Sequence, residues 1–321
     1  MHFIKHQSYN HIIDISNWIP DADYEKAYPQ GARTKKAVFS DFISPNPFIK
    51  PNFRYMFKQS FERYPDQFWA EIIAYKVACE MKIHVPPTFV AIDGETCGAL
   101  IEWFYDENAS CFLRYIEGST YFLEFIDDFD LKKGSQHNIT TLFDIFYRLN
   151  KPPVFSVQKN WIVQLGLIFL FDALIGNTDR HQDNWGVIVC QVDDESQIVK
   201  VAPAFDNGTS LGHEILPKNF CKYNNPMMLT KYIERGTHHL KEESDSKRQI
   251  KHLDLMDFFL PSCKSYFLKH LNCLDLERLK STLLELEKFE LSVPISKNRL
   301  LFTHMLLTER YHRIKEKIEN V

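Results

Sequence analysis

The sequence has little glycine and no excess of basic charge. Gly accounts for 11 of the 321 residues, against 26 Phe and 14 Tyr, so the chain is not collagen-like, linker-rich or disordered. Its 38 Lys and Arg are outnumbered by 42 Asp and Glu, which gives a net charge of -4. Without an overall basic field, direct binding to nucleic acid is not expected, although a local basic patch stays open.

The sequence also lacks an export signal and a membrane-spanning run. The N-terminal residues do not combine a basic region with an apolar run, as a signal peptide would. The most apolar stretch, 161–175, is shorter than the ~20 residues of a membrane span and contains Gln164 and Asp172, which predicts a buried helix. The seven cysteines form no C-x-x-C pair, which argues against a disulfide framework or a zinc cage. We expect a cytoplasmic protein; export without a cleaved signal stays open.

Hydrophobic periodicity predicts two parts, an N-terminal lobe of residues 1–105 and a C-terminal lobe of residues 106–321. The first part is rich in strands and has one helix; the second is largely helical and has one internal hairpin. Strands are predicted at 37–43, 53–58, 89–92, 97–104, 185–192 and 197–202. Helices are predicted at 65–82, 140–149, 157–175, 253–272, 274–290 and 297–319. This order predicts an α+β fold with a small β-rich lobe and a larger helical lobe.

A polar loop follows the apolar helix and carries several groups suited to catalysis. Residues 176–184 read GNTDRHQDN, and residues 205–208, after the second hairpin strand, read FDNG. Asp179 and Asn184 have the D-x-x-x-x-N spacing of a protein-kinase catalytic loop, and Asp206 stands where that fold keeps its metal-binding turn. Phosphoryl transfer needs such a set, namely an acid to orient or deprotonate a hydroxyl and oxygen ligands for Mg²⁺.

These two segments resemble the HipA-like serine/threonine kinases. The resemblance is strong over 165–212 and weaker over 31–105, and it is closest to short members of the HipT and CtkA type because the chain begins near the kinase core. It implies a two-lobed protein-kinase-like fold that uses ATP and Mg²⁺. In this reading Asp179 is the catalytic acid–base, and Asn184 and Asp206 hold the metal. Similar loops occur in phosphoinositide kinases, so the motif indicates the superfamily better than the substrate.

The N-terminal lobe should supply the groups that grip the nucleotide. A kinase needs a strand Lys on the α- and β-phosphates and a helix Glu that holds this Lys, and Lys58 with Glu71 fits that pattern. A phosphate-covering loop is predicted at 30–36, with Gly31, Arg33 and Lys35 as its binding residues. The hinge that takes adenine is predicted at 102–105, and it includes Glu102 and Phe104.

Neighbouring histidines are given structural roles. His181 is expected to orient the loop beside Asp179, because a His in a polar loop more often bonds to nearby backbone than acts as a base. His238 and His239 lack a third metal ligand at useful spacing and are expected in a solvated loop.

The expected function is therefore ATP- and Mg-dependent transfer of a phosphoryl group to Ser or Thr of a protein substrate. The resemblance adds a role as toxin or effector kinase, an antitoxin partner, and autophosphorylation near the phosphate loop, at Thr34 or Ser40. Two alternatives stay open. One is a phosphoinositide kinase, which the acidic net charge disfavours; the other is an inactive kinase-like binding module.

Overall fold

The computed structural model describes residues 7–22, 24, 34–44, 46–106, 113–149, 155–157, 160–191 and 197–320. The chain forms two compact units, each assembled from separate segments. The first consists of Met1–Trp103, Asn207–Leu229 and Cys273–Glu309, and the second of Phe104–Asp206, Thr230–Asn272 and Arg310–Val321. The first boundary thus falls inside the predicted hinge, whereas parts of the predicted C-terminal lobe group with the first unit.

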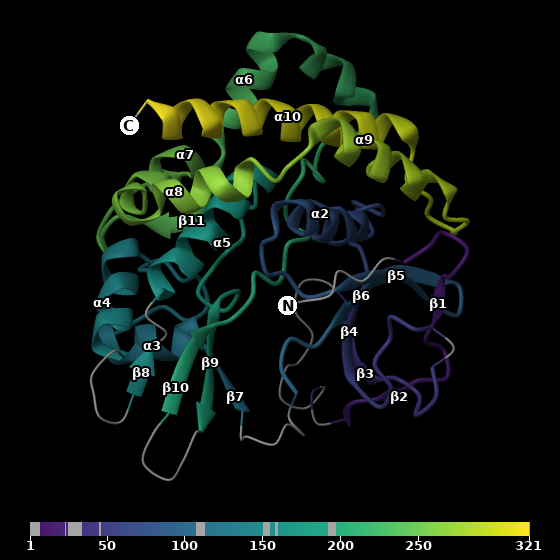
Figure 1. The fold of residues 1–321 in the computed structure, drawn as a ribbon, viewed down its shortest axis with the longest axis horizontal. Helices are drawn as coiled ribbons and strands as arrows, with labels where there is room; N and C mark the ends of the chain where they lie inside the picture. Colours follow the sequence, from purple (N-terminus) through teal and green to yellow (C-terminus); the bar gives the residue numbers. More distant parts are fainter. Residues whose placement is uncertain are drawn as a thin grey trace. The chain divides into compact units, whose positions relative to one another are not determined.

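A six-stranded sheet forms the base of the first unit (Figure 1). Its strand order is β1-β5-β6-β4-β3-β2, and all neighbours are antiparallel except the parallel pair β1 and β5. The bounds are β1 Ile13–Asp14, β2 Ile19–Pro20, β3 Lys35–Phe39, β4 Arg54–Lys58, β5 Thr88–Asp93 and β6 Thr96–Glu102. The inward side chains include Tyr55, Phe57, Phe89 and Leu100, all fully buried, so aromatic and branched residues fill the core as the composition predicted.

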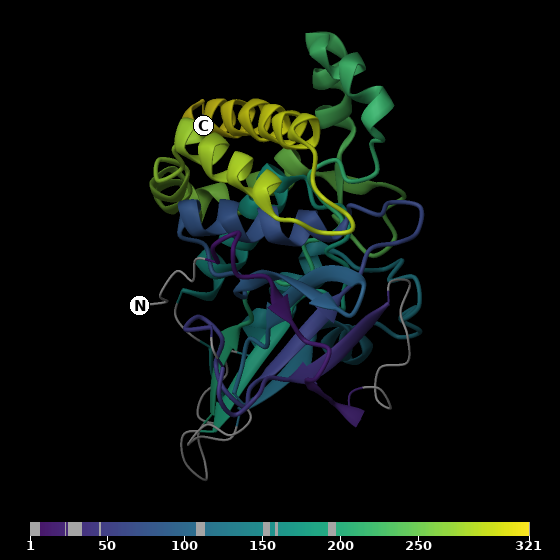
Figure 2. The same cartoon turned by 90° about the vertical axis from the view of Figure 1, so that its right-hand side faces the viewer.

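Helix α2, Phe68–Met81, packs on strands β5 and β6 of this sheet (Figure 1). Its other side meets α9, Leu276–Leu284, so α2 is covered from both sides (Figure 2). The indole Nε1 of Trp69 donates to the carbonyl of Val293 at 3.1 Å, which satisfies the polar atom of a nearly buried ring. This packing fixes α2 and the side chains that it carries.

Gly98 of β6 allows this strand to lie close to the end of β4. A Cβ at this position would lie 2.5 Å from the carbonyl oxygen of Lys58 and 2.8 Å from the ring of Phe57. No larger residue fits without moving β4. The sequence at 98 therefore bears directly on the placement of Lys58.

The second unit combines a four-stranded sheet with helices. The sheet order is β7-β9-β10-β8, with β7 Leu113–Glu117, β8 Phe155–Val157, β9 Gly186–Gln191 and β10 Gln197–Val201. Its α-helices are α3 Gly118–Phe125, α4 Ile139–Leu149, α5 Trp161–Ile175, α7 His252–Leu255 and α8 Leu260–Leu271. A small sheet pairs β11 Thr237–Lys241 with β12 Gln249–Lys251.

Two further α-helices cross the boundary between the units. α6 spans Pro226–Arg235 and α10 spans Lys297–Glu319, and the unit boundary falls within each of them. Short 3-10 turns lie at Pro217–Asn224, Met256–Phe258 and Glu285–Lys288.

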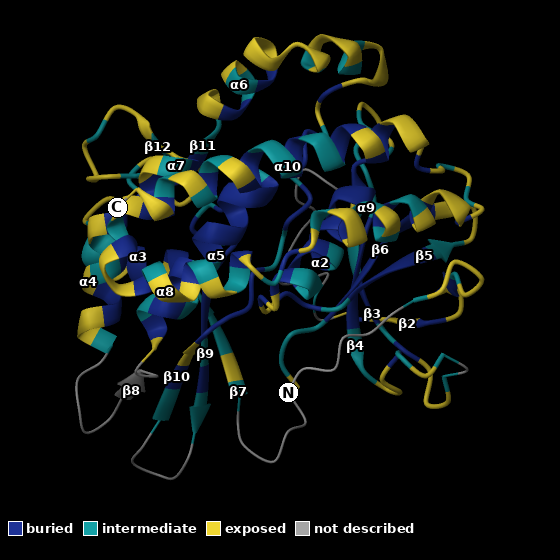
Figure 3. Ribbon diagram, turned by 45° about the horizontal axis from the view of Figure 1, so that its top comes forward, coloured by how far each residue is buried: buried dark blue, intermediate teal, exposed yellow. Residues whose placement is uncertain are grey.

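Helix α5 is buried along most of its length (Figure 3). It packs against α7, α8 and β10, which matches its apolar sequence on every face. Asp172 is its fully buried charged side chain. The helix ends at Gly176, whose φ of +66° lies in the left-handed region that favours glycine.

The predicted α+β class is confirmed. The sequence did not predict β1, β2, β7, β8, β11, β12, α3 and α6, and the predicted elements differ from the observed ones mainly at their ends. The predicted strand 37–43 is β3 and ends at Phe39, and the predicted helix 157–175 starts at Trp161. The helix predicted at 253–272 is broken into α7, a 3-10 turn and α8, because Pro261 favours the first turn of a new helix. No helix in the described ranges has both the length and the apolar character needed to cross a membrane.

Gly98→Ala should destabilise the first unit by about 1–3 kcal/mol, because the added methyl group forces β4 and β6 apart. The free energy of unfolding in urea measures this loss. Gly94→Asn is the matched control, since Gly94 lies in the turn between β5 and β6 with φ of +60° and no atom near its added Cβ. Asn tolerates this conformation, so its cost should stay under about 1 kcal/mol. Equal losses in both variants would contradict the role given to Gly98.

Candidate active site

The first unit contains a buried ion pair between Lys58 and Glu71. Lys58 is the last residue of β4, and its Nζ lies 3.2 Å from Oε1 of Glu71 on α2. The two residues are 7% and 2% exposed, so each charge depends on the other for compensation. The sequence prediction of this pair is therefore matched by the geometry.

The second carboxylate oxygen of Glu71 reaches the turn that follows Asp206. Oε2 accepts a hydrogen bond from the backbone N–H of Asn207 at 2.9 Å. The same turn is also bound by Gln67, the residue directly before α2. Its Nε2 donates to the carbonyl of Gly208 at 3.1 Å. One carboxylate thus holds the predicted phosphate-binding Lys with one oxygen and the predicted metal turn with the other.

Lys35 lies opposite Lys58 in the register of β3 and β4. Directly opposed residues of an antiparallel pair project from the same face, where two like charges are unfavourable unless counter-charge is near. Glu71 supplies one such charge. Gly31 and Arg33 of the predicted phosphate loop lie outside the described residues.

The two predicted hinge residues have different surroundings. Glu102 ends β6 and is buried; its carboxylate lies 2.8 Å from Nζ of Lys50 and 3.5 Å from the hydroxyl of Tyr55. Its side chain is thus engaged within the sheet. Phe104 belongs to the second unit, where its ring stacks on Phe205 at 5.0 Å and meets Tyr115 edge-on at 5.2 Å.

In the second unit, Asn177 shapes the loop after α5. Its Nδ2 donates to Asp172 at 3.2 Å, and its Oδ1 accepts from the backbone N–H of Asp179 at 3.0 Å. The Nδ2 of Asn184 then donates to the carbonyl of Asp179 at 2.6 Å. These bonds bring Asp179 and Asn184 together, as their spacing predicted.

Asn184 and Asp206 offer a suitable donor set for Mg²⁺. The amide nitrogen of Asn184 is engaged by protein, which leaves Oδ1, the ligating atom, for a cation. Asp206 adopts φ of +55°, a left-handed conformation that is uncommon outside glycine and clusters at functional sites. Two oxygen donors fit Mg²⁺, which completes its shell with water and phosphate oxygens. Among the described residues no group of three or more His, Cys, Asp or Glu side chains could hold a metal ion unaided.

A buried arginine connects this loop to the segment before Asp206. Nε and Nη2 of Arg180 bond the two carboxylate oxygens of Asp172 at 3.0 and 2.7 Å. Nη1 donates to the carbonyl of Asn184 at 3.1 Å and also to that of Phe205. No role for Arg180 or Asp172 was predicted from the sequence. The signal that could have indicated a buried ion pair is the one charged residue, Asp172, inside a largely apolar helix.

The expectation that His238 and His239 lie in a solvated loop is wrong. Both belong to β11, and His238 is fully buried with its Nε2 at 3.3 Å from Asp172. His252 is also buried, and its Nε2 lies 2.7 Å from the carbonyl of Asn177. The polar sequence of 237–252 suggested a solvent-exposed loop. The buried carboxylate of Asp172 needs hydrogen-bond partners, however, and His238 is one of them.

Burial and charge set the protonation of these groups. Burial lowers the pKa of His252 to about 3 and that of His239 to about 4, and it also lowers the pKa of His238. Burial opposes ionisation of Asp172, yet Arg180 and His238 outweigh it and lower the pKa of the carboxyl. Burial likewise disfavours charged His181, but its hydrogen bond to Asp183 and the charges of Asp179, Asp183 and Asp206 raise its pKa.

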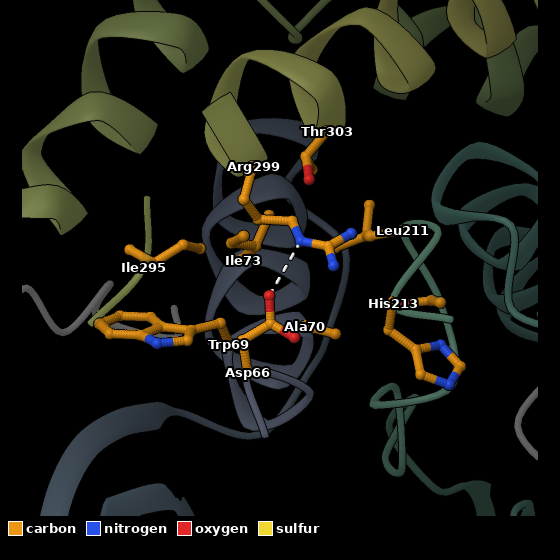
Figure 4. Close-up of a pocket in the computed structure, with 10 residues that line it drawn as sticks. Asp66, Trp69, Ala70, Ile73, Leu211, His213, Ile295, Arg299 and Thr303 are labelled. Atoms are coloured by element: carbon orange, nitrogen blue, oxygen red, sulfur yellow. Dashed lines mark hydrogen bonds and ion pairs between the residues drawn. The ribbon is translucent and has the colours of Figure 1, made fainter. Parts of the chain in front are cut away.

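The segment after the predicted metal turn is held by Arg299 of α10 (Figure 4). Arg299 donates to Asp66 at 3.0 Å and to the carbonyls of Gly212 and Ile215 at 3.0 and 2.8 Å. A small pocket lies beside this guanidinium, lined by Trp69, Ile73 and Thr303 among others. All these residues belong to the first unit, so the course of 207–215 is set within it.

These features define the class, a protein-kinase-like fold with a Lys–Glu pair in one unit and a catalytic-type loop in the other. The chain belongs to the HipA-like C-terminal domain family, which it matches over residues 28–253. The resemblance drawn from the sequence is thus confirmed.

One solved structure shares the fold, and two others are less similar. The Helicobacter pylori proinflammatory kinase CtkA is similar with a TM-score of 0.71 and 19% identity, over 97% of both chains. HipA of Shewanella oneidensis, solved with HipB and operator DNA, gives a TM-score of 0.48 and 11% identity over 97% of this chain and 75% of that one. The Golgi casein kinase with Mn/ADP bound gives 0.44 and 13%, over 91% and 72%. A comparison with curated protein sequences finds no match.

The buried neutral histidines predict a loss of stability in mild acid. In the unfolded chain His252 gains a proton below its ordinary pKa of 6.5, whereas in the folded protein it stays neutral down to about 3. Below pH 6.5 the unfolded state therefore binds more protons, and stability falls with pH. Between pH 7 and pH 5 this one group should cost about 2 kcal/mol, measurable as a drop in the free energy of unfolding in urea.

His252→Gln can keep a donor toward Asn177 but does not titrate, so it should lose less stability than wild type over the same pH range. His312→Gln, on an exposed position of α10, is the control and should behave as wild type. An identical pH dependence in wild type and His252→Gln would show that His252 does not contribute.

Proposed function

We propose that the protein is an ATP- and Mg-dependent kinase that transfers the γ-phosphoryl group to a Ser or Thr hydroxyl of a protein. The observation that carries the proposal is the carboxylate of Glu71, which bonds Lys58 at 3.2 Å and the N–H of Asn207 at 2.9 Å. A buried Lys–Glu pair beside a metal-binding turn is what kinases use to hold ATP phosphates. An ion pair that only stabilised the fold would not need the second oxygen of Glu71 to accept a hydrogen bond from the N–H of Asn207.

In this proposal Lys58 binds the α- and β-phosphates, and Lys35, opposite it in the strand register, adds positive charge to the same face. Glu71 acts through Lys58 as a positioning residue. The hinge region around Glu102 and Phe104 takes the adenine. Because the Glu102 side chain is bound to Lys50, we expect the adenine contact to come from backbone there.

Asp179 orients the substrate hydroxyl and accepts its proton. The hydroxyl oxygen forms the new bond to the γ-phosphorus, the bond from that phosphorus to the β–γ bridging oxygen breaks, and ADP leaves. When bound through Asn184 and Asp206, Mg²⁺ supplies positive charge against the phosphate oxygens. In such a reaction most of the rate enhancement comes from the positioning of the reacting groups and from electrostatic stabilisation. Small changes in this loop should therefore have large effects on the rate.

The proposed substrate class and biological role follow from family membership and net charge. Family membership favours a protein hydroxyl, a toxin or effector role, and an antitoxin-type partner. The net charge of -4 disfavours a kinase acting at an anionic lipid surface, where each Lys or Arg adds about 1 kcal/mol of binding. Incubation with labelled ATP, followed by mass spectrometry of labelled lysate proteins and by a parallel assay on phosphatidylinositol vesicles, separates these substrates.

Asp179→Asn should reduce the phosphoryl-transfer rate by about 10²–10⁴-fold, because the proton acceptor is removed. Affinity for Mg·ATP, measured by calorimetry, should stay nearly unchanged, since this carboxylate acts on the nucleophile. Asp206→Ala should instead weaken Mg·ATP binding, because a metal ligand is lost.

Asp183→Asn is the control in the same loop, as its carboxylate is bound to His181 rather than placed on the substrate. It should keep turnover within about fivefold of wild type, the scale of a modest loss in transition-state stabilisation. Full activity of a folded Asp179→Asn protein would contradict the assignment. Absence of Mg·ATP binding in wild type would favour the inactive binding module.

The two predicted autophosphorylation sites differ in exposure. Thr34 is exposed directly before β3, whereas Ser40 is buried. The hydroxyl of Ser40 donates to the carbonyl of Lys50 at 2.6 Å and accepts from the N–H of Phe53 at 3.0 Å. Phosphorylation of Ser40 would require breaking these bonds, so Thr34 is the better candidate.

Prolonged incubation with ATP should place phosphate on Thr34, detectable by tandem mass spectrometry, and should reduce activity because the added charge repels ATP phosphates. Thr34→Ala should remove this phosphate, and Thr34→Ser should retain it. Phosphate on Ser40, or none within residues 30–40, would contradict the prediction.

A further inference from the structure

We propose that Arg180 is a positioning residue that sets the spacing of the two metal-binding segments, with Asp172 and His238 holding its guanidinium in place. The inference rests on the proposed function, since it concerns the use of Mg²⁺ at Asn184 and Asp206. It assigns a role to three buried polar residues that have no direct part in the reaction.

One nitrogen of Arg180 joins the two segments. Nη1 donates to the carbonyl of Asn184 at 3.1 Å and to the carbonyl of Phe205, the residue before Asp206. Residues 184 and 206 are far apart in sequence and are separated by the hairpin of β9 and β10. Because both carbonyls share one donor, their separation is fixed within the length of two hydrogen bonds.

The other side of the guanidinium is held by a carboxylate. Nε and Nη2 bond the two oxygens of Asp172 in a bidentate pair, at 3.0 and 2.7 Å. His238 adds a contact of 3.3 Å to Oδ2 of Asp172. Arg180, Asp172 and His238 are all fully buried, so the rigid α5 helix and strand β11 determine where the guanidinium lies.

Only an arginine can make this set of bonds. Its planar fork donates in fixed directions from several nitrogens, whereas a lysine ammonium is a single point on a flexible chain. A lysine could keep its charge near Asp172 or reach the carbonyls, but not bridge both. A substitution to Lys therefore tests geometry at constant charge.

The consequence for catalysis is specific to the metal. If the spacing of the two segments is lost, Asn184 and Asp206 no longer present their oxygens at the distance Mg²⁺ requires, because Mg²⁺ demands near-ideal octahedral geometry. Residues behind metal ligands commonly change metal affinity by about 10–100-fold when altered. Nucleotide binding without metal depends on Lys58 and the hinge and should not change.

The experiment compares the full chain as wild type, Arg180→Lys and Asp172→Asn. Kinase assays titrate MgCl₂ at fixed ATP, and calorimetry measures ADP affinity in EDTA. Both variants should raise the Mg²⁺ concentration for half-maximal activity by about tenfold or more, and leave ADP affinity in EDTA within about twofold of wild type. Mn²⁺ should restore part of the activity, because its geometric demands are weaker than those of Mg²⁺.

Arg310→Lys is the control for loss of a buried guanidinium in the same unit. Arg310 is 6% exposed and donates to the carbonyl of Ala173 on α5 at 3.2 Å. It should lower Tm without changing the Mg²⁺ requirement. If Arg180→Lys does not fold, Asp172→Asn provides the same readout through the other half of the pair.

An unchanged Mg²⁺ requirement in either folded variant would overturn the inference while leaving the proposed function intact, as would an equal shift in Arg310→Lys. A wild-type protein that neither binds Mg·ATP nor transfers phosphate would overturn both the proposed function and this inference.

Discussion

A buried carboxylate must be fully bonded, and within each unit of this protein several predicted site residues are arranged around one. In the first unit Glu71 bonds Lys58 and the backbone N–H of Asn207. In the second unit Asp172 bonds Arg180, Asn177 and His238. An unpaired charge at either position would cost several kcal/mol, so the bonds that satisfy the carboxylates also hold the polar segments in one arrangement.

The two carboxylates differ in what they hold. Glu71 holds a cation that the proposed reaction uses directly, whereas Asp172 holds a cation that acts on backbone carbonyls. Within its own unit each set includes a bond to a chain neighbour of Asp206, to Asn207 from Glu71 and to Phe205 from Arg180. A residue with φ of +55° is strained, and flanking bonds of this kind are what keeps such a conformation populated.

The Lys58–Glu71 part of the candidate site was predictable from local sequence patterns. Lys58 ends a strand with clear β character, and Glu71 lies one turn into the following amphipathic helix, so their pairing followed from chain order and known kinase chemistry. The buried environment of His238 was not predictable, because the polar residues around it are typical of loops. Nor was the bond between Arg180 and Phe205, which joins residues 25 positions apart.

By itself the sequence determined the α+β class, the main helices and the chemical groups of the candidate catalytic loop, because periodicity and short spacings act within one element or one turn. Only the tertiary structure decided which buried charges meet. Such pairs form between elements distant in sequence, and their energy depends on burial that no local pattern encodes. The exposure of Thr34 against the burial of Ser40, and the place of Gly98 beside Lys58, were decided in the same way.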